Sequence, residues 1–82
     1  MPERKSIFDR GRDIVAAQLD VAKDKITSET HLVNDLGADS LDRVRLALWF
    51  EDEFDLPEIP DGKAAKLETF GDWVSYAEKH TP

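Results

Sequence analysis

The sequence predicts an all-α protein, a small bundle of three main helices plus one short helix, with a long loop between the first two main helices. Three observations support this prediction: helical spacing of apolar residues, capping patterns before them and the lack of strand-like alternation. Apolar residues recur at helical spacing in three stretches, and each stretch follows a Ser, Thr or Asp with an acidic residue three positions later, a pattern typical of helix N-termini. No stretch alternates between polar and apolar residues for long enough to indicate a strand.

The first main helix is expected to begin at Ser6. Ser6 and Asp9 are spaced as a capping box, in which the hydroxyl and the carboxylate each bind a free backbone amide. The apolar residues at helical spacing are Ile7, Phe8, Ile14, Val15 and Leu19. We expect this helix to end near Leu19 or Asp20.

Residues 20–39 lack a helical stripe and are rich in residues that favour turns. A loop of about twenty residues is uncommon in a compact domain unless it is tied down or functional. The apolar residues expected to anchor it are Ile26, Leu32, Val33 and Leu36.

The second main helix is predicted to open at Asp39-Ser40 and to run to about Phe54. Asp39 is the expected N-cap, and Asp42 is at the third helical position. Both acids suit the positive end of the helix dipole.

The last third of the chain contains a short helix and the third main helix. Pro57, Pro60 and Gly62 interrupt the chain, so a helix within residues 61–66 has room for one or two turns. The spacing of Thr69 and Asp72 predicts a second capping box. The apolar residues that follow at helical spacing are Phe70, Trp73, Val74 and Ala77.

The helix over residues 40–54 has two apolar stripes. Leu46, Phe50 and Phe54, joined by Ala47, form the expected core face. The second stripe, formed by Leu41, Val44 and Leu48, lies roughly 150° away around the helix. It has a charged border and is a docking surface, a part of the core beneath the long loop, or a stripe that is partly buried and partly presented.

Ser40 lies at the N-terminus of this helix, where free amides and the helix dipole favour a bound or attached phosphate. Serine is also a common capping residue. Its position alone therefore leaves two interpretations, a phosphate anchor and a cap.

Length and composition limit the number of domains and the classes of partner and chemistry. Eighty-two residues allow one domain, residues 1–82, expected to be a monomer. A net charge of −7 argues against nucleic acid and anionic membranes as partners. The chain has no cysteine, so disulfides, thiolate metal sites and thiol chemistry of its own side chains are excluded. No apolar run indicates a signal peptide or membrane insertion, and a cytoplasmic location is expected.

Other residues give weaker signals. His31 and His80 do not suggest a metal site, and a hydrolase built on Ser40 would lack the GxSxG turn. The remaining aromatic residues are interpreted as core or rim residues, and these are Trp49, Trp73 and Tyr76.

The segment NDLGADSLD, residues 34–42, resembles the attachment motif of acyl carrier proteins. The similarity continues through IVAAQL (14–19), ITSET (26–30), EDEFD (51–55) and EIPD (58–61), in the same order as in the family. It therefore covers most of the chain.

The resemblance implies that Ser40 accepts 4′-phosphopantetheine from coenzyme A, through a separate phosphopantetheinyl transferase that uses magnesium. The domain would then be a carrier rather than an enzyme. A prosthetic arm with a thiol would supply the sulfur that this cysteine-free chain lacks. The implied partners are acyl-transferring and acyl-modifying enzymes of a lipid, fatty-acid or polyketide pathway.

The resemblance also assigns a partner-reading face and a place for the acyl chain. The residues expected to contact partner enzymes are Asp39, Leu41, Asp42, Val44, Arg45 and Leu48. The acyl chain is expected to fold back toward core residues such as Leu46, Phe50 and Ile59.

Several positions depart from the family pattern. Arg45 stands where a glutamate is usual, and Arg43 where an uncharged residue is usual. A basic segment, residues 62–66, replaces an acidic stretch, Leu56-Pro57 lengthens the chain by one residue, and Trp49 replaces a small residue.

These departures indicate a specialised carrier with dedicated partners, while the general fatty-acid carrier is the conservative alternative.

Residues 21–60 still hold −6 of the net charge, because this stretch contains ten acidic and four basic residues. A hypothesis from a different class is an unmodified helical adaptor, in which Ser40 is only a helix cap.

Overall fold

The computed structural model describes residues 6–81. Its helices are α1 (Ile7–Leu19), the short 3₁₀ helix η1 (Lys23–Lys25), α2 (Ser40–Phe54), α3 (Asp61–Ala64) and α4 (Phe70–His80). The part of the chain from 6 to 81 has no β-strand, and a single isolated bridge joins His31 to Thr69. The predicted all-α class, with three main helices and one short one, is confirmed.

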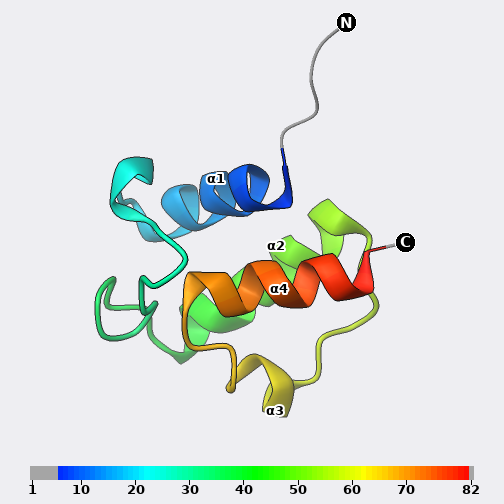
Figure 1. Ribbon diagram of the computed structural model, residues 1–82. Helices are drawn as coiled ribbons and strands as arrows, with labels where there is room; N and C mark the ends of the chain where they lie inside the picture. Colours follow the sequence, from blue (N-terminus) through cyan, green and yellow to red (C-terminus); the bar gives the residue numbers. More distant parts are fainter. Residues whose placement is uncertain (1–5, 82) are drawn as a thin grey trace, which may run out of the picture.

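Helix α1 packs across α2 and α4, and α3 packs against α2 away from α1 (Figure 1). The long segment between α1 and α2 closes one end of the bundle. Helix α2 therefore contacts α1 on one side and α3 on another, and its Phe50 also meets Trp73 of α4.

The predicted N-termini of α1 and α4 are found, with one difference. In α4, Asp72 N donates to Thr69 Oγ1 at 3.1 Å and Thr69 N donates to Asp72 Oδ2 at 3.1 Å, a complete capping box. In α1, Asp9 N donates to Ser6 Oγ at 3.1 Å. The carboxylate of Asp9 instead accepts from Arg12 Nη2 at 3.4 Å, so only half of that box forms among the described residues.

The predicted ends of α1 and α2 are also confirmed. Each helix is followed by an aspartate in the left-handed conformation, Asp20 with φ 56° and Asp55 with φ 54°. Aspartate visits this conformation more readily than most residues because its short polar side chain can hydrogen-bond locally.

The core is a cluster of apolar side chains from the three main helices, the long loop and the segments on either side of α3. Phe50 of α2 and Trp73 of α4 meet with ring centroids 5.3 Å apart, and Phe8 of α1 meets Phe70 of α4 at 5.1 Å. The largest fully buried side chains are Trp73, Phe50, Phe70, Ile26, Leu32, Leu46 and Val15. The predicted core face of α2 is confirmed, since Leu46, Ala47, Phe50 and Phe54 are all buried.

Three of the four predicted loop anchors contact the core. Ile26 and Leu32 are buried and Leu36 is partly buried against the cluster, whereas Val33 is 38% exposed. The prediction for Val33 is wrong because residues 31–37 form helix-like turns, in which residues four apart share a face. Leu32 and Leu36 face the core together, so Val33 turns outward.

Sequence patterning does not reveal η1, because none of its three residues is buried. It forms a single turn closed by hydrogen bonds from Lys25 N to Ala22 O at 3.1 Å and from Ile26 N to Lys23 O at 3.0 Å. The turn brings the chain from the end of α1 to its anchor Ile26.

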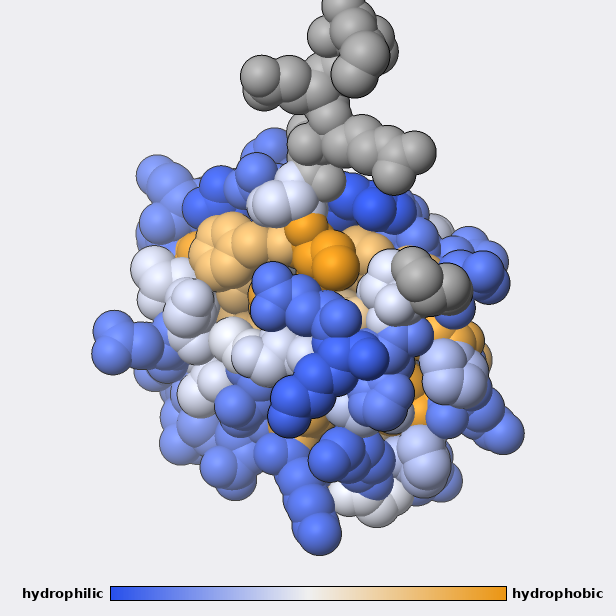
Figure 2. All heavy atoms as spheres, turned by 45° about the vertical axis from the view of Figure 1, so that its right-hand side comes forward, coloured by the Kyte–Doolittle hydropathy of each residue, from blue (hydrophilic) through white to orange (hydrophobic). Residues whose placement is uncertain are grey.

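Charged residues cover much of the surface. Figure 2 shows one face on which hydrophilic residues predominate, with hydrophobic ones gathered in a band and in smaller areas near one edge. Within residues 6–81, no helix combines the length and the apolar character needed to cross a membrane.

Candidate functional site

The N-terminus of α2 is built by a turn and a complete capping box. Gly37 adopts φ 72°, a left-handed conformation that glycine enters without steric cost, and Ala38 is buried just before the helix. Asp42 N then donates to Asp39 Oδ1 at 2.8 Å, and Asp39 N donates to Asp42 Oδ2 at 3.2 Å. The capping role predicted for Asp39 is confirmed.

Ser40 is the first residue of α2 and is exposed. Its hydroxyl has no hydrogen-bond partner among residues 6–81, and neither do the backbone amides of Ser40 and Leu41. The side chain that caps the helix belongs to Asp39, so the structure does not use Ser40 as the cap. An accessible hydroxyl beside free amides at the positive end of a helix suits an attached phosphate.

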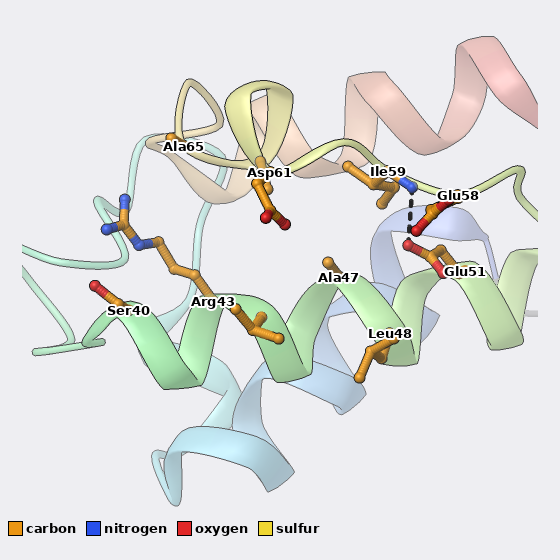
Figure 3. Close-up of a pocket in the computed structure, with 11 residues that line it drawn as sticks. Ser40, Arg43, Ala47, Leu48, Glu51, Glu58, Ile59, Asp61 and Ala65 are labelled. Carbon is orange, nitrogen blue, oxygen red and sulfur yellow. Dashed lines mark hydrogen bonds between the residues drawn. The ribbon is translucent and has the colours of Figure 1, made fainter.

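A groove of about 230 Å³ runs from Ser40 between α2 and the segment that contains α3 (Figure 3). Ser40 is at one end, and Glu51 and Glu58 are at the other. Glu51 Oε2 accepts from Ile59 N at 2.8 Å, which ties the segment before α3 to α2. The residues that line the groove are Ser40, Arg43, Val44, Ala47, Leu48, Glu51, Glu58, Ile59, Asp61, Ala64 and Ala65.

The groove corresponds only in part to the predicted acyl site. Ile59 lines it, as expected. Leu46 and Phe50 lie in the core, as expected, with 0% and 1% of their surfaces exposed, but neither lines the groove. The groove is also lined by Ala47, Ala64 and Ala65. The sequence predicts Ala47 only as part of the core face, and nothing in the sequence separates Ala64 and Ala65 from surface alanines.

The second stripe of α2 is a free surface. Leu41, Val44 and Leu48 are 56%, 49% and 59% exposed. The alternative that this stripe completes the core is therefore wrong. Val44 and Leu48 also line the groove, so the stripe and the groove form one continuous apolar region that starts beside Ser40.

The remaining predicted contact residues surround the same end of α2. Asp39 and Asp42 use their carboxylates in the cap and are still at least partly accessible. Arg45 is exposed and has no ion pair within the described part of the chain. Trp49, one helical turn after Arg45, is 54% exposed and lines a second groove, of about 290 Å³, with Ile14 and Ala17 of α1.

Arg43 lines the same groove as Ser40, a position that the sequence analysis does not predict. It lines the groove beside Ser40 and is partly buried, whereas the sequence identified it only as a departure from a family pattern. Its spacing of three residues from Ser40 could have indicated this, because residues three apart on a helix are neighbours.

The two histidines lie apart from this site. His31 is in the long loop, where its Nδ1 accepts from Asn34 N at 3.1 Å, and His80 contacts Tyr76 at the end of α4 with ring centroids 4.3 Å apart. Among residues 6–81, no group of three or more His, Cys, Asp or Glu side chains could hold a metal ion.

Comparisons with known proteins agree with this geometry. The family model described as "Phosphopantetheine attachment site" matches residues 12–77. The chain is 47% identical over 76 residues to the acyl carrier protein of Lactobacillus acidophilus, with 93% of this chain and 94% of the relative covered. It is 50% identical over 74 residues to the acyl carrier protein of Bdellovibrio bacteriovorus, with 90% and 94% covered. It is 47% identical over 74 residues to that of Akkermansia muciniphila, with 90% and 91% covered.

The match spans α2, its cap, the groove and most of the other two main helices. An exposed serine at a helix N-terminus, whose hydroxyl binds none of the residues from 6 to 81, fits the group that this family carries. On the family match and these three relatives, the chain belongs to the acyl carrier protein family, whose members carry phosphopantetheine and are carriers rather than catalysts.

Proposed function

We propose that Ser40 is the attachment site for 4′-phosphopantetheine and that the protein holds acyl intermediates as thioesters on this arm. The observation that carries the proposal is the Ser40 hydroxyl, which is exposed, has no partner within the described residues and lies at the mouth of an apolar groove. A serine with a structural role would be expected to bind a backbone amide or carbonyl, and the Ser40 hydroxyl binds neither within residues 6–81.

The chain's own residues would divide the work as follows. Ser40 would lose its proton and bond its oxygen to the phosphorus of the arm as the nucleotide half of coenzyme A leaves. The free amides at the start of α2 would stabilise the negative charge of the resulting phosphodiester. When bound, the arm supplies the thiol that carries acyl groups, which a chain without cysteine cannot supply itself. The apolar wall formed by Val44, Ala47 and Ile59 can shield part of an acyl chain from water.

The exposed stripe of Leu41, Val44 and Leu48 would dock the partner enzymes. It combines an apolar centre with a charged border, which is typical of transient protein interfaces. The expected partners are a phosphopantetheinyl transferase and acyl-transferring or acyl-modifying enzymes of a fatty-acid, lipid or polyketide pathway. We expect the carrier to act as a monomer in the cytoplasm, as is usual for the family.

Loading with purified components tests the attachment site. Incubation of the wild-type chain with coenzyme A, magnesium and a promiscuous phosphopantetheinyl transferase should add the mass of one phosphopantetheine. Ser40→Ala should abolish the gain, since no oxygen remains at that position. Ser75→Ala, which removes another exposed helical serine, is the matched control and should load normally.

The outcome also separates the carrier from an unmodified adaptor. An adaptor would gain no mass and would keep its cellular function after Ser40→Ala. Since Asp39 caps α2, the adaptor hypothesis no longer gives Ser40 any role. A wild-type chain that stays unmodified under conditions that load another acyl carrier protein would overturn the proposal.

A further inference from the structure

Arg43 extends along α2 toward the helix N-terminus. Figure 3 shows its side chain rising from α2 into the end of the groove where Ser40 lies, with the guanidinium between the level of Ser40 and the segment that carries Ala65. This direction follows from helix geometry, because long side chains lean toward the N-terminus and residues three apart share a face. The helix therefore places this cation at the same end of the groove as the proposed attachment residue.

This guanidinium has no partner in the described residues. Arg10 pairs with Glu53 at 2.8 Å and Arg12 contacts Asp9 at 3.4 Å, but Arg43 makes no ion pair or side-chain hydrogen bond among residues 6–81, although it is partly buried. Two acidic residues that line the groove do not form an ion pair with it. Glu51 accepts from Ile59 N, and Asp61, across the groove in Figure 3, does not reach ion-pair distance.

We propose that Arg43 is a positioning residue, whose guanidinium binds the phosphodiester formed on Ser40 and directs the first part of the arm along the groove. This inference rests on the proposed function. A guanidinium matches phosphate oxygens with two parallel hydrogen bonds, and such charge-assisted bonds are stronger than neutral ones. Covalent attachment three residues away keeps the phosphate at a high effective concentration beside the cation.

Two arginines on the same helix provide a matched comparison. Arg43 borders the groove, whereas Arg45 is exposed and two positions further along, roughly 160° around the helix on the side away from Ser40. Replacing either by glutamine removes one positive charge from α2. Only Arg43→Gln removes a cation from the neighbourhood of the phosphate.

The test compares the apo and the loaded forms of the wild type, Arg43→Gln, Arg43→Lys and Arg45→Gln. Mass spectrometry first establishes that each chain is loaded, which tests the proposed function separately. The ³¹P chemical shift of the loaded chain and the change in Tm on loading are then measured at low and high salt. The apo Tm values show that each variant folds.

In the wild type and Arg45→Gln, we expect the same phosphodiester resonance and the same change in Tm on loading. In Arg43→Gln, the resonance should move toward that of the free arm. The change in Tm on loading should be lower than in the wild type by about 2–4 °C, because the loaded form loses the contact between cation and phosphate. Arg43→Lys should lie between them, because it keeps the charge and loses the paired hydrogen bonds. High salt should reduce the differences.

Loaded Arg43→Gln and Arg45→Gln with the same ³¹P shift and the same change in Tm would overturn the inference while leaving Ser40 as the attachment site. A wild type that cannot be loaded would instead overturn the proposed function. A variant with a changed apo Tm but an unchanged difference on loading would show a role for Arg43 in the fold alone, and would also contradict the inference.

Discussion

Gly71, at the start of α4, lies so close to the long loop that a β-carbon has no room. An added Cβ would be 2.7 Å from the carbonyl oxygen of Ser28, to which Gly71 N itself donates at 2.9 Å. The opposing atom belongs to the backbone and cannot move away as a flexible side chain can. This single residue therefore fixes how closely the loop approaches α4.

We expect Gly71→Ala to lower the free energy of unfolding by about 1–3 kcal/mol, because the loop must move away or α4 must shift. Urea denaturation of the apo protein measures the change. Gly62→Ala is the control, since a Cβ there meets nothing within 4 Å. It should be neutral or slightly stabilising, as alanine favours a helix more than glycine does. Equal effects of the two substitutions would contradict this account of the contact.

Some residue-level features could be predicted and others could not. Asp39 and Asp42 are recognisable because capping chemistry depends on residue type and spacing within one turn. The prediction that Val33 anchors the loop is wrong because Val33 and Leu32 are both apolar, and composition does not show which one faces the core. The hydrogen bonds of residues 31–37 determine that Leu32 does. The approach at Gly71 depends on residues 43 positions apart in the sequence, where spacing carries no information.

At the scale of an element, α2 combines two apolar faces with different roles. The face with Leu46, Phe50 and Phe54 is buried, and the stripe with Leu41, Val44 and Leu48 is exposed from Ser40 onward. The sequence predicts both stripes from helical periodicity, but it cannot show whether a neighbouring segment covers the second one. That depends on where the loop and α3 pack.

Leu46 and Leu48 offer a matched test on one helix, with 0% and 59% of their surfaces exposed. Leu46→Ala should cost about 2–5 kcal/mol in unfolding free energy, because it removes buried methyl groups and leaves a cavity. Leu48→Ala should change stability by no more than about 0.5 kcal/mol. Denaturation of both apo variants measures the difference.

For binding to partner enzymes we expect the reverse order, with a larger effect of Leu48→Ala than of Leu46→Ala. Leu48→Ala should weaken the interaction with the phosphopantetheinyl transferase, seen as a raised KM for the carrier, because the docking stripe loses its most exposed member. A Leu48→Ala chain that loads with an unchanged KM would contradict the assignment of this stripe as a docking surface. Strong destabilisation of the same chain would indicate that Leu48 belongs to the core instead.

At the scale of the whole molecule, contacts between distant segments hold the bundle around the site. Leu32 N donates to Glu68 O at 3.0 Å and Phe70 N donates to Thr30 O at 2.8 Å, which join the long loop to the start of α4. Arg10 of α1 binds the carboxylate and the carbonyl of Glu53 at the end of α2, both at 2.8 Å. The sequence predicts the helices and the anchored loop, but not these pairings.

The distribution of charge over the molecule bears on the choice of partners. Residues 21–60 hold −6 of the net charge of −7, and Arg45 is an exposed positive charge on α2 within this acidic stretch. A partner with a basic patch would be attracted by the domain as a whole and repelled locally at Arg45, and like charges at an interface cost affinity.

We therefore expect enzymes of general fatty-acid synthesis to use the loaded wild type poorly, and Arg45→Glu to raise their kcat/KM by about tenfold, which corresponds to about 1.4 kcal/mol. Lys79→Glu makes the same charge change near the end of α4, remote from Ser40 along the chain, and is the control. Efficient use of the wild type, with no gain from Arg45→Glu, would favour the general fatty-acid carrier over the specialised one.

The most direct test of the central claim is the mass of the peptide that contains Ser40, from protein isolated from the organism that makes it. A modified serine, with the added mass of phosphopantetheine located at residue 40 by fragmentation, is the predicted result. A peptide that is consistently unmodified, or a modification at another residue, would contradict the assignment of Ser40 as the carrier site.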